Sequence, residues 1–178
     1  MKTPFARSYW IIPDRFLAGC YPGALEAAVA EARATGLVQA GITLCVSLME
    51  PTELDHSGKP FTDYSPQVHR AALRLGREVG FLRLPIVDGG IPTPDLMRRT
   101  LDAIDAELAA GGRVYLHCWG GRGRTGTVVG CWLMRHGRAD RANVLEAISG
   151  LIDPVKDLFV PSPETDLQRR FLVEGSAV

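Results

Sequence analysis

The sequence lacks an apolar run long enough to cross a bilayer. Its longest stretch without a charged residue is 34–49, and 125–134 is a further one, whereas a membrane-spanning helix needs about 18 or more consecutive apolar residues. It also lacks the apolar core of a secretory signal, because Arg7, Pro13 and Asp14 interrupt the N-terminal segment. We therefore expect a protein with no membrane span and a cytoplasmic location.

The sequence has no surplus of positive charge. Its 20 Lys and Arg residues balance its 20 Asp and Glu residues, whereas a nucleic-acid binder gathers an excess of Lys and Arg on one face. Nucleic acid is therefore not an expected partner. Lysine itself is scarce, with 3 lysines against 17 arginines. This bias suits bidentate contacts to anions, but genome base composition also explains it.

Metal-binding spacing is missing among the four cysteines, Cys20, Cys45, Cys118 and Cys131. No two of them form a C-x-x-C pair, and a chain in a reducing compartment does not build a disulfide framework. We expect no metal and no other cofactor. Each cysteine is then either a core residue or a reactive thiol, and Cys45 and Cys131 lie in apolar segments that favour the core.

The order of expected elements indicates an α/β fold around a largely parallel sheet. With 178 residues, 46% of them hydrophobic, the chain can bury a core of its own. No repeat or linker divides it, so we expect one domain over residues 1–178, with a long surface loop at 51–66. The patterns predict strands over 9–12, 16–18, 42–48, 81–87 and 114–117, and helices over 24–35 (closed by Gly36), 65–79, 93–110, 124–136, 140–149 and 162–173.

The most informative segment connects the strand at 114–117 to the helix that follows. From His117 to Gly126 it reads His-Cys-Trp-Gly-Gly-Arg-Gly-Arg-Thr-Gly. A glycine-rich turn at the start of a helix directs successive backbone N–H groups toward an anion. A cysteine at the end of the strand would lie under these amides, which with the helix dipole would stabilise its thiolate. Arg124, in the first helical turn, could bind two oxygens of one phosphate.

The complete string is specific, although parts of it are not. A cysteine followed six positions later by arginine is expected by chance on the order of 0.4 times in a chain of this composition. Requiring also the preceding histidine, the two loop glycines and the following Thr-Gly lowers this to about one in a million. Among the four cysteines, only Cys118 has an arginine at that distance.

This string resembles the signature loop of the cysteine-dependent protein tyrosine phosphatase superfamily. The short chain suggests the dual-specificity branch, with a likeness to small bacterial members similar to the kinase-associated phosphatase. Weaker similarities at 15–19, 84–90 and 162–163 extend the resemblance over most of the chain. The resemblance implies a protein tyrosine phosphatase-like α/β fold and a phosphatase that needs no cofactor.

The resemblance also implies roles for the residues of the loop. Cys118 would attack phosphorus to give a phosphocysteine, and Arg124 would clamp the equatorial oxygens of the transition state. Thr125 would donate a hydrogen bond to the sulfur, and His117 would orient the loop without acting as the base. The phosphate would be bound by the loop residues Trp119, Gly120, Gly121, Arg122, Gly123 and Arg124.

The leaving oxygen needs a proton, so a carboxylic acid is expected elsewhere in the chain. Asp88 lies 30 residues before Cys118 and directly before Gly89 and Gly90, whose conformational freedom would let a loop close over the substrate. Asp88 therefore matches the mobile acid loop of the family, although an Asp-Gly turn is the simpler explanation of the pair alone. Asp95 is a competitor that a position in the first turn of a helix explains.

Three further residues have two interpretations each. Gln168 faintly resembles the water-positioning glutamine of the larger tyrosine-specific enzymes, but an exposed helix position is the favoured explanation. Arg122 adds a second cation to the loop, which either binds a second phosphate or points to solvent. Trp119 is expected to pack beneath the loop rather than to stack on a substrate.

The sequence thus favours a phosphomonoesterase that acts on phosphotyrosine, and on phosphoserine or phosphothreonine if the pocket is shallow. The expected partner is a phosphorylated protein or a phosphorylated small molecule. An alternative keeps the mechanism and takes phosphoinositides or inositol phosphates, because of Arg122. Less favoured are an inactive phosphate-binding module, since the cysteine, arginine and acid are all present, and sulfur transfer on a rhodanese-like loop.

Overall fold

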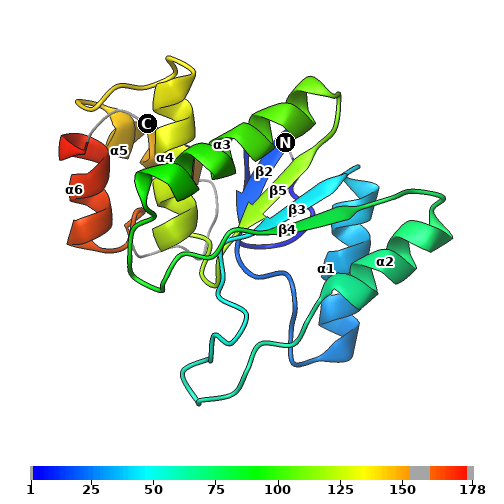
Figure 1. The fold of residues 1–178 in the computed structure, drawn as a ribbon. Coiled ribbons are helices and arrows are strands. Elements are labelled where there is room, and N and C mark those ends of the chain that lie inside the picture. The colour runs from blue at the N-terminus through cyan, green and yellow to red at the C-terminus, as the bar shows by residue number, and fades with distance from the viewer. Residues whose placement is uncertain (1, 153–160, 176–178) are drawn as a thin grey trace.

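The computed structural model describes residues 2–152 and 161–175 (Figure 1). Within these residues the strands form a single sheet in the order β1-β2-β5-β3-β4. β1 is antiparallel to β2, and all the other pairs are parallel. The expected α/β fold with a mostly parallel sheet is confirmed. The strands are β1 (Ser8–Ile12), β2 (Phe16–Gly19), β3 (Leu44–Ser47), β4 (Gly80–Arg83) and β5 (Val114–His117).

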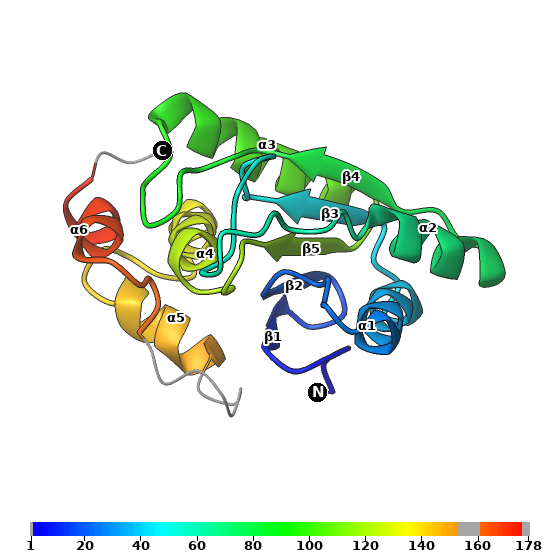
Figure 2. The same cartoon turned by 90° about the horizontal axis from the view of Figure 1, so that it is seen from below.

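Helices cover both faces of the sheet (Figure 2). α1 (Ala27–Gln39) and α2 (Ser65–Arg74) pack against each other on one face. The other face is covered by α3 (Pro94–Ala109), α4 (Gly123–Arg135) and α5 (Val144–Ile152), and α6 (Asp166–Glu174) packs against α4 and α5. The central strand β5 is buried along its whole length, which explains its almost wholly apolar sequence. None of the helices in the described part of the chain has the length and apolar character that a bilayer crossing requires.

The parallel strands place four connecting segments at one edge of the sheet. Because β2, β3, β4 and β5 run in the same direction, the chain leaves all of them on the same side. Ligand sites in α/β sheets form at this carboxyl edge. The segments that begin there are 20–26, 48–64, 84–93 and 118–122.

Several helix and strand ends agree with the sequence expectations. The hydroxyl of Thr93 accepts a hydrogen bond from the N–H of Leu96, as expected of an N-cap followed by proline. β5 has the predicted bounds, and α4 lies within one residue of them at each end. The strand and the helix on either side of the signature loop were therefore correctly predicted.

The prediction that Gly36 closes the first helix is wrong. α1 continues through this residue to Gln39, and the left-handed glycine beyond its end is Gly41, with φ of 79°. Gly36 instead permits a close approach of the N-terminal segment, because a Cβ there would lie 3.0 Å from the carbonyl oxygen of Pro4. The glycine is needed for close packing against another segment and does not mark the end of the helix.

Other predicted bounds need smaller corrections. β4 ends at Arg83 rather than 87 because Pro85 has no N–H to donate. Its neighbours Leu84 and Ile86 still donate, to the carbonyl of Ser47 at the end of β3 and to that of Leu48 just after it, so this segment continues beside that end of β3. α2 ends at Arg74 rather than 79. α5 and α6 each begin four residues later than predicted: a hydrogen-bonded turn at 140–143 precedes α5, and a bent segment at 162–165, held by the side chain of Gln168, precedes α6.

Candidate active site

The loop at 118–122 directs its backbone N–H groups toward the space that the loop surrounds. Each carbonyl oxygen of residues 119–122 accepts a hydrogen bond from a group outside the loop, so the carbonyls point outward. The N–H groups of the same residues have no acceptor in the described part of the chain. The donors to the carbonyls are the Tyr21 N–H at 2.9 Å, Arg7 Nη2 at 3.0 Å, Tyr9 Oη at 3.4 Å and Ser162 Oγ at 2.9 Å.

A glycine is required in the middle of this loop. Gly121 has φ of 76°, and a Cβ there would lie 2.4 Å from the carbonyl carbon of Gly19. The loop therefore lies directly on the end of β2, which fixes its curvature. The resulting ring of N–H groups at the start of α4 is a site for an anion.

Cys118 lines a cavity of about 360 Å³ that this loop partly encloses. The residue is only 2% exposed, so the protein shields it from bulk solvent. Arg122, Arg124 and Asp88 line the same cavity. The structure thus brings the sequence-predicted thiol, guanidinium and acid together around one space.

The guanidinium of Arg124 is held by a carboxylate that the sequence did not reveal as part of the site. Glu53, in the long loop after β3, accepts from Nη1 at 2.6 Å and from Nη2 at 2.8 Å. Nη1 also donates to the carbonyl of Ile86 at 3.1 Å. The side chains of Arg124 and Glu53 are 1% and 7% exposed, and an ion pair this well buried needs such complete hydrogen bonding.

These contacts leave one side of the guanidinium available. Both N–H groups of Nη1 and one of Nη2 have acceptors, which leaves the Nε–H and the second N–H of Nη2, adjacent along one edge. This edge matches two oxygens of one phosphate. Burial alone would lower the pKa of Arg124, but Glu53, Cys118 and Asp88 together raise it, so the group is charged.

Asp88 lies at the mouth of the cavity and contacts this available edge. Its Oδ1 is 2.8 Å from Nη2 of Arg124, and its side chain is 60% exposed. The chain beyond it is fixed to α6: Thr165 Oγ1 donates to the carbonyl of Gly89 at 3.1 Å, and Gln168 Nε2 donates to that of Gly90 at 2.9 Å. Asp88 is thus exposed beside a firmly anchored segment.

The expectation that Gln168 is an exposed helix residue is wrong. It is fully buried, and besides its bond to Gly90 its Oε1 accepts from the N–H groups of Glu164 and Thr165. Thr165 caps α6, so the two residues form a capping box. The Thr-x-x-Gln spacing was visible in the sequence and would have indicated this role.

His117 supports the loop as a neutral side chain. Its ring is fully buried, and burial lowers the pKa of His117 to about 3. Nδ1 lies 3.2 Å from the carbonyl of Cys118, which can only accept, so Nδ1 carries the proton. Nε2 then accepts from the hydroxyl of Tyr64 at 2.7 Å. Tyr64, on the segment that leads into α2, is a second site residue that the sequence did not reveal.

The remaining loop residues differ from expectation in part. Thr125 is buried, but its hydroxyl has no hydrogen-bond partner among residues 2–152 and 161–175, Cys118 included. Arg122 is half-buried and lines the cavity. The half-buried ring of Trp119 packs against the hydrophobic core and contacts His56 at 4.3 Å and Phe61 at 5.2 Å between centroids.

Comparison with known families agrees with this geometry. The family model described as "Swiss Army Knife protein, DSP-PTPase phosphatase domain" matches residues 6–157, which include the loop, Asp88 and Glu53. The chain belongs to the dual-specificity branch of the cysteine-dependent protein tyrosine phosphatase superfamily. The expected family is therefore confirmed.

Relatives of this dual-specificity phosphatase domain include longer proteins. The dual specificity protein phosphatase CDC14C of Homo sapiens is 28% identical over 169 residues, which cover 89% of this chain and 34% of the relative. The chain thus spans about a third of the length of these relatives. The protein of the same name from Symphalangus syndactylus is also 28% identical and is covered to 31%.

Solved structures of the superfamily share the fold. A kinase associated phosphatase (KAP), with its catalytic cysteine replaced by serine, superposes with a TM-score of 0.72 at 16% identity, covering 97% of this chain and 93% of that one. PTPMT1 in complex with PI(5)P gives a TM-score of 0.66 at 20% identity, covering 94% and 93%. At these identities the likeness concerns the fold.

Proposed function

We propose that this domain, taken as one catalytic unit over residues 1–178, hydrolyses phosphomonoesters through a phosphocysteine intermediate. The observation that carries the proposal is the arrangement of Cys118 and the available edge of Arg124 on one small cavity, beneath the N–H groups of 119–122. Such preorganised donors stabilise the charge of a phosphoryl group in transfer.

In the first step, the thiolate of Cys118 attacks phosphorus. The S–P bond forms as the P–O ester bond breaks, and Asp88 gives its proton to the leaving oxygen. Arg124 and the loop N–H groups bind the equatorial oxygens. The histidine before the nucleophile takes no proton, because His117 is neutral and already hydrogen-bonded on both nitrogens.

In the second step, water attacks phosphorus and Asp88 accepts its proton. The electrons of the S–P bond return to sulfur, and inorganic phosphate leaves. Thr125 supplies a hydroxyl for the departing sulfur, which agrees with its burial and with its lack of a partner in the described chain.

The contact between Asp88 and Arg124 gives the acid a defined starting position. A phosphate oxygen needs the second N–H of Nη2, and Oδ1 of Asp88 lies 2.8 Å from this nitrogen. Substrate binding therefore displaces the carboxylate from Arg124, while the two bonds to Glu53 keep the guanidinium in place. The displaced carboxylate of Asp88 is 60% exposed, so it takes up a proton from solvent and then approaches the leaving oxygen as the acid.

Aryl phosphates such as phosphotyrosine are the first substrate class. Trp119 and His56 line the cavity, and Phe61 packs against Trp119, so an aromatic leaving group would meet aromatic side chains. Phosphoserine and phosphothreonine remain in the proposed range. A second candidate class is the inositol phosphates and phosphoinositides, which Arg122 favours because its Nε is buried with no partner in the described chain; the neighbour PTPMT1 was solved with PI(5)P.

The direct test is phosphate release from phosphotyrosine, phosphoserine and inositol polyphosphate substrates. We expect the largest kcat/KM for the phosphotyrosine peptide, with no change on adding EDTA, because the proposed steps use only side chains of this chain. Arg122→Ala should lower turnover of inositol polyphosphates selectively. Binding of phosphate without release from any substrate would instead indicate a binding module.

Glu53 should act as a positioning residue for Arg124. Glu53→Gln keeps the shape and loses the charge, so we expect kcat/KM for an aryl phosphate to fall about thirtyfold, the effect of one charge-assisted hydrogen bond. Inhibition by vanadate should weaken in parallel, since vanadate uses the same guanidinium edge. Glu78→Gln, at an exposed position outside the cavity, is the control. Unchanged vanadate inhibition in a folded Glu53→Gln protein would limit Glu53 to a structural role.

A further inference from the structure

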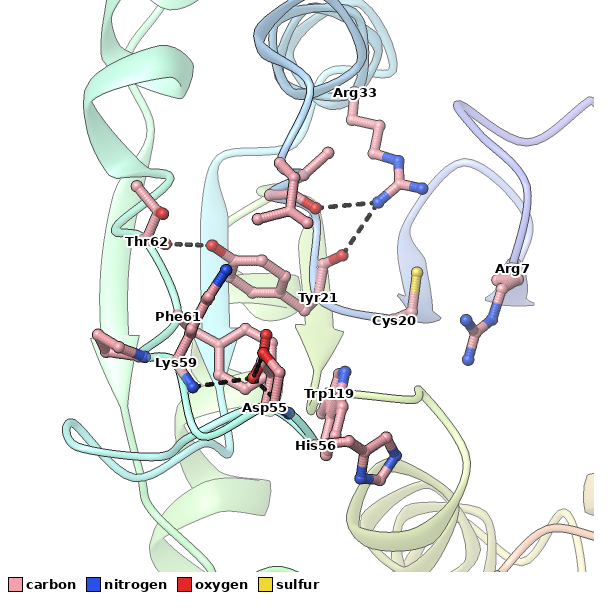
Figure 3. Close-up of a pocket in the computed structure, with 15 residues that line it drawn as sticks. Arg7, Cys20, Tyr21, Arg33, Asp55, His56, Lys59, Phe61, Thr62 and Trp119 are labelled. Atoms are coloured by element: carbon pink, nitrogen blue, oxygen red, sulfur yellow. Dashed lines mark hydrogen bonds between the residues drawn. The ribbon is translucent and has the colours of Figure 1, made fainter.

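A second, larger pocket lies beside the catalytic cavity and shares a wall with it. Its volume is about 700 Å³, within the range of small-molecule sites. The segment after β2 and the loop around Lys59 form its sides (Figure 3). Arg7, His56 and Trp119 line both the pocket and the catalytic cavity. A molecule with its phosphate over Cys118 can therefore extend past these side chains into the second pocket.

A continuous aromatic wall connects the two spaces. Trp119 contacts Phe61 edge-on with 5.2 Å between centroids, and Phe61 contacts Tyr21 in the same way at 5.0 Å. The backbone N–H of Tyr21 also donates to the carbonyl of Trp119 at 2.9 Å. This wall begins at Trp119 in the signature loop and ends at Tyr21, and all three rings line the second pocket. It offers an apolar surface to the part of the substrate that carries the phosphate.

The second pocket is cationic although the chain as a whole has no net charge. Arg7, Arg33 and Lys59 line it, against the single carboxylate of Asp55. Asp55 is occupied by its own turn, where it accepts from the N–H groups of Ser57 and Lys59. Figure 3 shows the three cations on different sides of the pocket, with Tyr21 between Arg33 and Lys59.

Backbone carbonyls, rather than carboxylates, hold the two arginines. Arg33 Nη1 donates to the carbonyls of Gly23 at 3.0 Å and Tyr21 at 3.4 Å, and Arg7 Nη2 donates to that of Gly120 at 3.0 Å. Neither arginine, nor Lys59, forms a salt bridge with any residue of the described ranges. The Nε of Arg7 is buried without a partner there. The two arginines are thus held in place, and none of the three cations has a carboxylate within salt-bridge distance among these residues.

We propose that this pocket binds a second anionic group of the substrate, a phosphate or carboxylate carried on an apolar body that lies along the aromatic wall. The inference rests on the proposed function, because the first phosphate is taken to lie over Cys118. It adds that the preferred substrate is at least bifunctional: one phosphate for hydrolysis, a second anion for recognition.

Pairs of substrates that differ only in the second anion provide the test. One arm compares bisphosphates of alkanediols of graded chain length with the monophosphates of the same diols. The other compares phosphotyrosine peptides with and without flanking acidic residues, so the two arms distinguish a small-molecule from a peptide source of the anion. In the arm that contains the matching kind of substrate, we expect kcat/KM to be about tenfold higher with the second anion than without it. One charge-assisted hydrogen bond has an effect of this size.

Lys59→Glu is the main variant, because Lys59 is exposed and its replacement leaves the core intact. This replacement should bring the ratio of kcat/KM with the second anion to kcat/KM without it close to one. Arg33→Gln should act in the same direction. Arg99→Glu, at an exposed site on α3 outside both pockets, is the matched charge reversal and should leave the preference unchanged.

The outcomes separate this inference from the proposed function. Equal kcat/KM with and without the second anion in both arms would overturn the subsite while leaving the phosphatase intact. An equal loss of preference in Arg99→Glu would also overturn it, since net charge would then suffice. If no substrate is hydrolysed, calorimetric titration of Cys118→Ser with the same pairs decides: tighter binding of the bisphosphate, lost with Lys59→Glu, supports the subsite, and equal binding refutes it.

Discussion

Replacing Cys118 with serine is expected to lower kcat for phosphomonoesters by about 10⁴-fold or more. A serine hydroxyl stays protonated at neutral pH and lacks the nucleophilicity of a thiolate. The variant therefore cannot form the covalent intermediate of the proposed first step at a useful rate. The loop N–H groups and the available edge of Arg124 are untouched by the change. Binding of a phosphorylated substrate should therefore persist, measurable by calorimetry, while phosphate release disappears.

Cys131→Ser is the matched control. Cys131 lies on α4 within the apolar core, and burial raises the pKa of its thiol to about 12, so it stays protonated. The control should keep wild-type kcat if it folds, which circular dichroism would verify. Acid-quenched wild-type protein should carry a phosphoryl group on Cys118 by mass spectrometry. Turnover by Cys118→Ser close to that of the control would falsify the covalent route.

Replacing Asp88 with asparagine is expected to have the second largest effect, and one that depends on the leaving group. Loss of a general acid should slow the hydrolysis of alkyl phosphates by about 10³-fold. Esters of acidic phenols need no proton to leave and should slow about tenfold or less. Because the carboxylate 2.8 Å from Arg124 Nη2 also competes with an incoming oxyanion, the variant should bind vanadate more tightly than the wild type.

The combination of slower turnover and tighter oxyanion binding separates this role from simple damage to the loop. Asp95→Asn is the control, since Asp95 is the other acid that the sequence offered and it pairs only with Arg98 among the described residues. Equal losses for alkyl and aryl esters would assign the proton to another group. Weaker vanadate binding in Asp88→Asn would contradict the displacement of Asp88 by substrate.

The chemistry of this site was accessible from the sequence because one continuous segment holds most of it. From His117 to Thr125, each residue type is needed for a local reason: a buried strand end, a glycine-rich turn and a helix start. The flanking elements follow from ordinary patterns, such as the Thr93 cap and the apolar run of β5. The fold class follows from their alternation.

The residues that the sequence did not reveal act through contacts between distant segments. Glu53 is one acid in a polar loop, and only the return of that loop to the carboxyl edge places it 2.6 Å from Arg124. Tyr64 reaches His117 in the same manner. Gly36 and Gln168 were misinterpreted because their spacing suits two structures, and neighbours far along the chain, Pro4 and Gly90, select between them.

Because β5 lies between β2 and β3, the loops that follow these three strands contribute different parts of the site. The groups that break the phosphate ester come mostly from the loop after β5, whereas the walls of the neighbouring pocket come from the loops after β2 and β3. Insertions or deletions around residues 55–62 would thus change the surroundings of the group that carries the phosphate, whereas at 20–25 the N–H of Tyr21 also holds the signature loop. Exchanging these outer loops would change the range of substrates that a domain with this fold accepts.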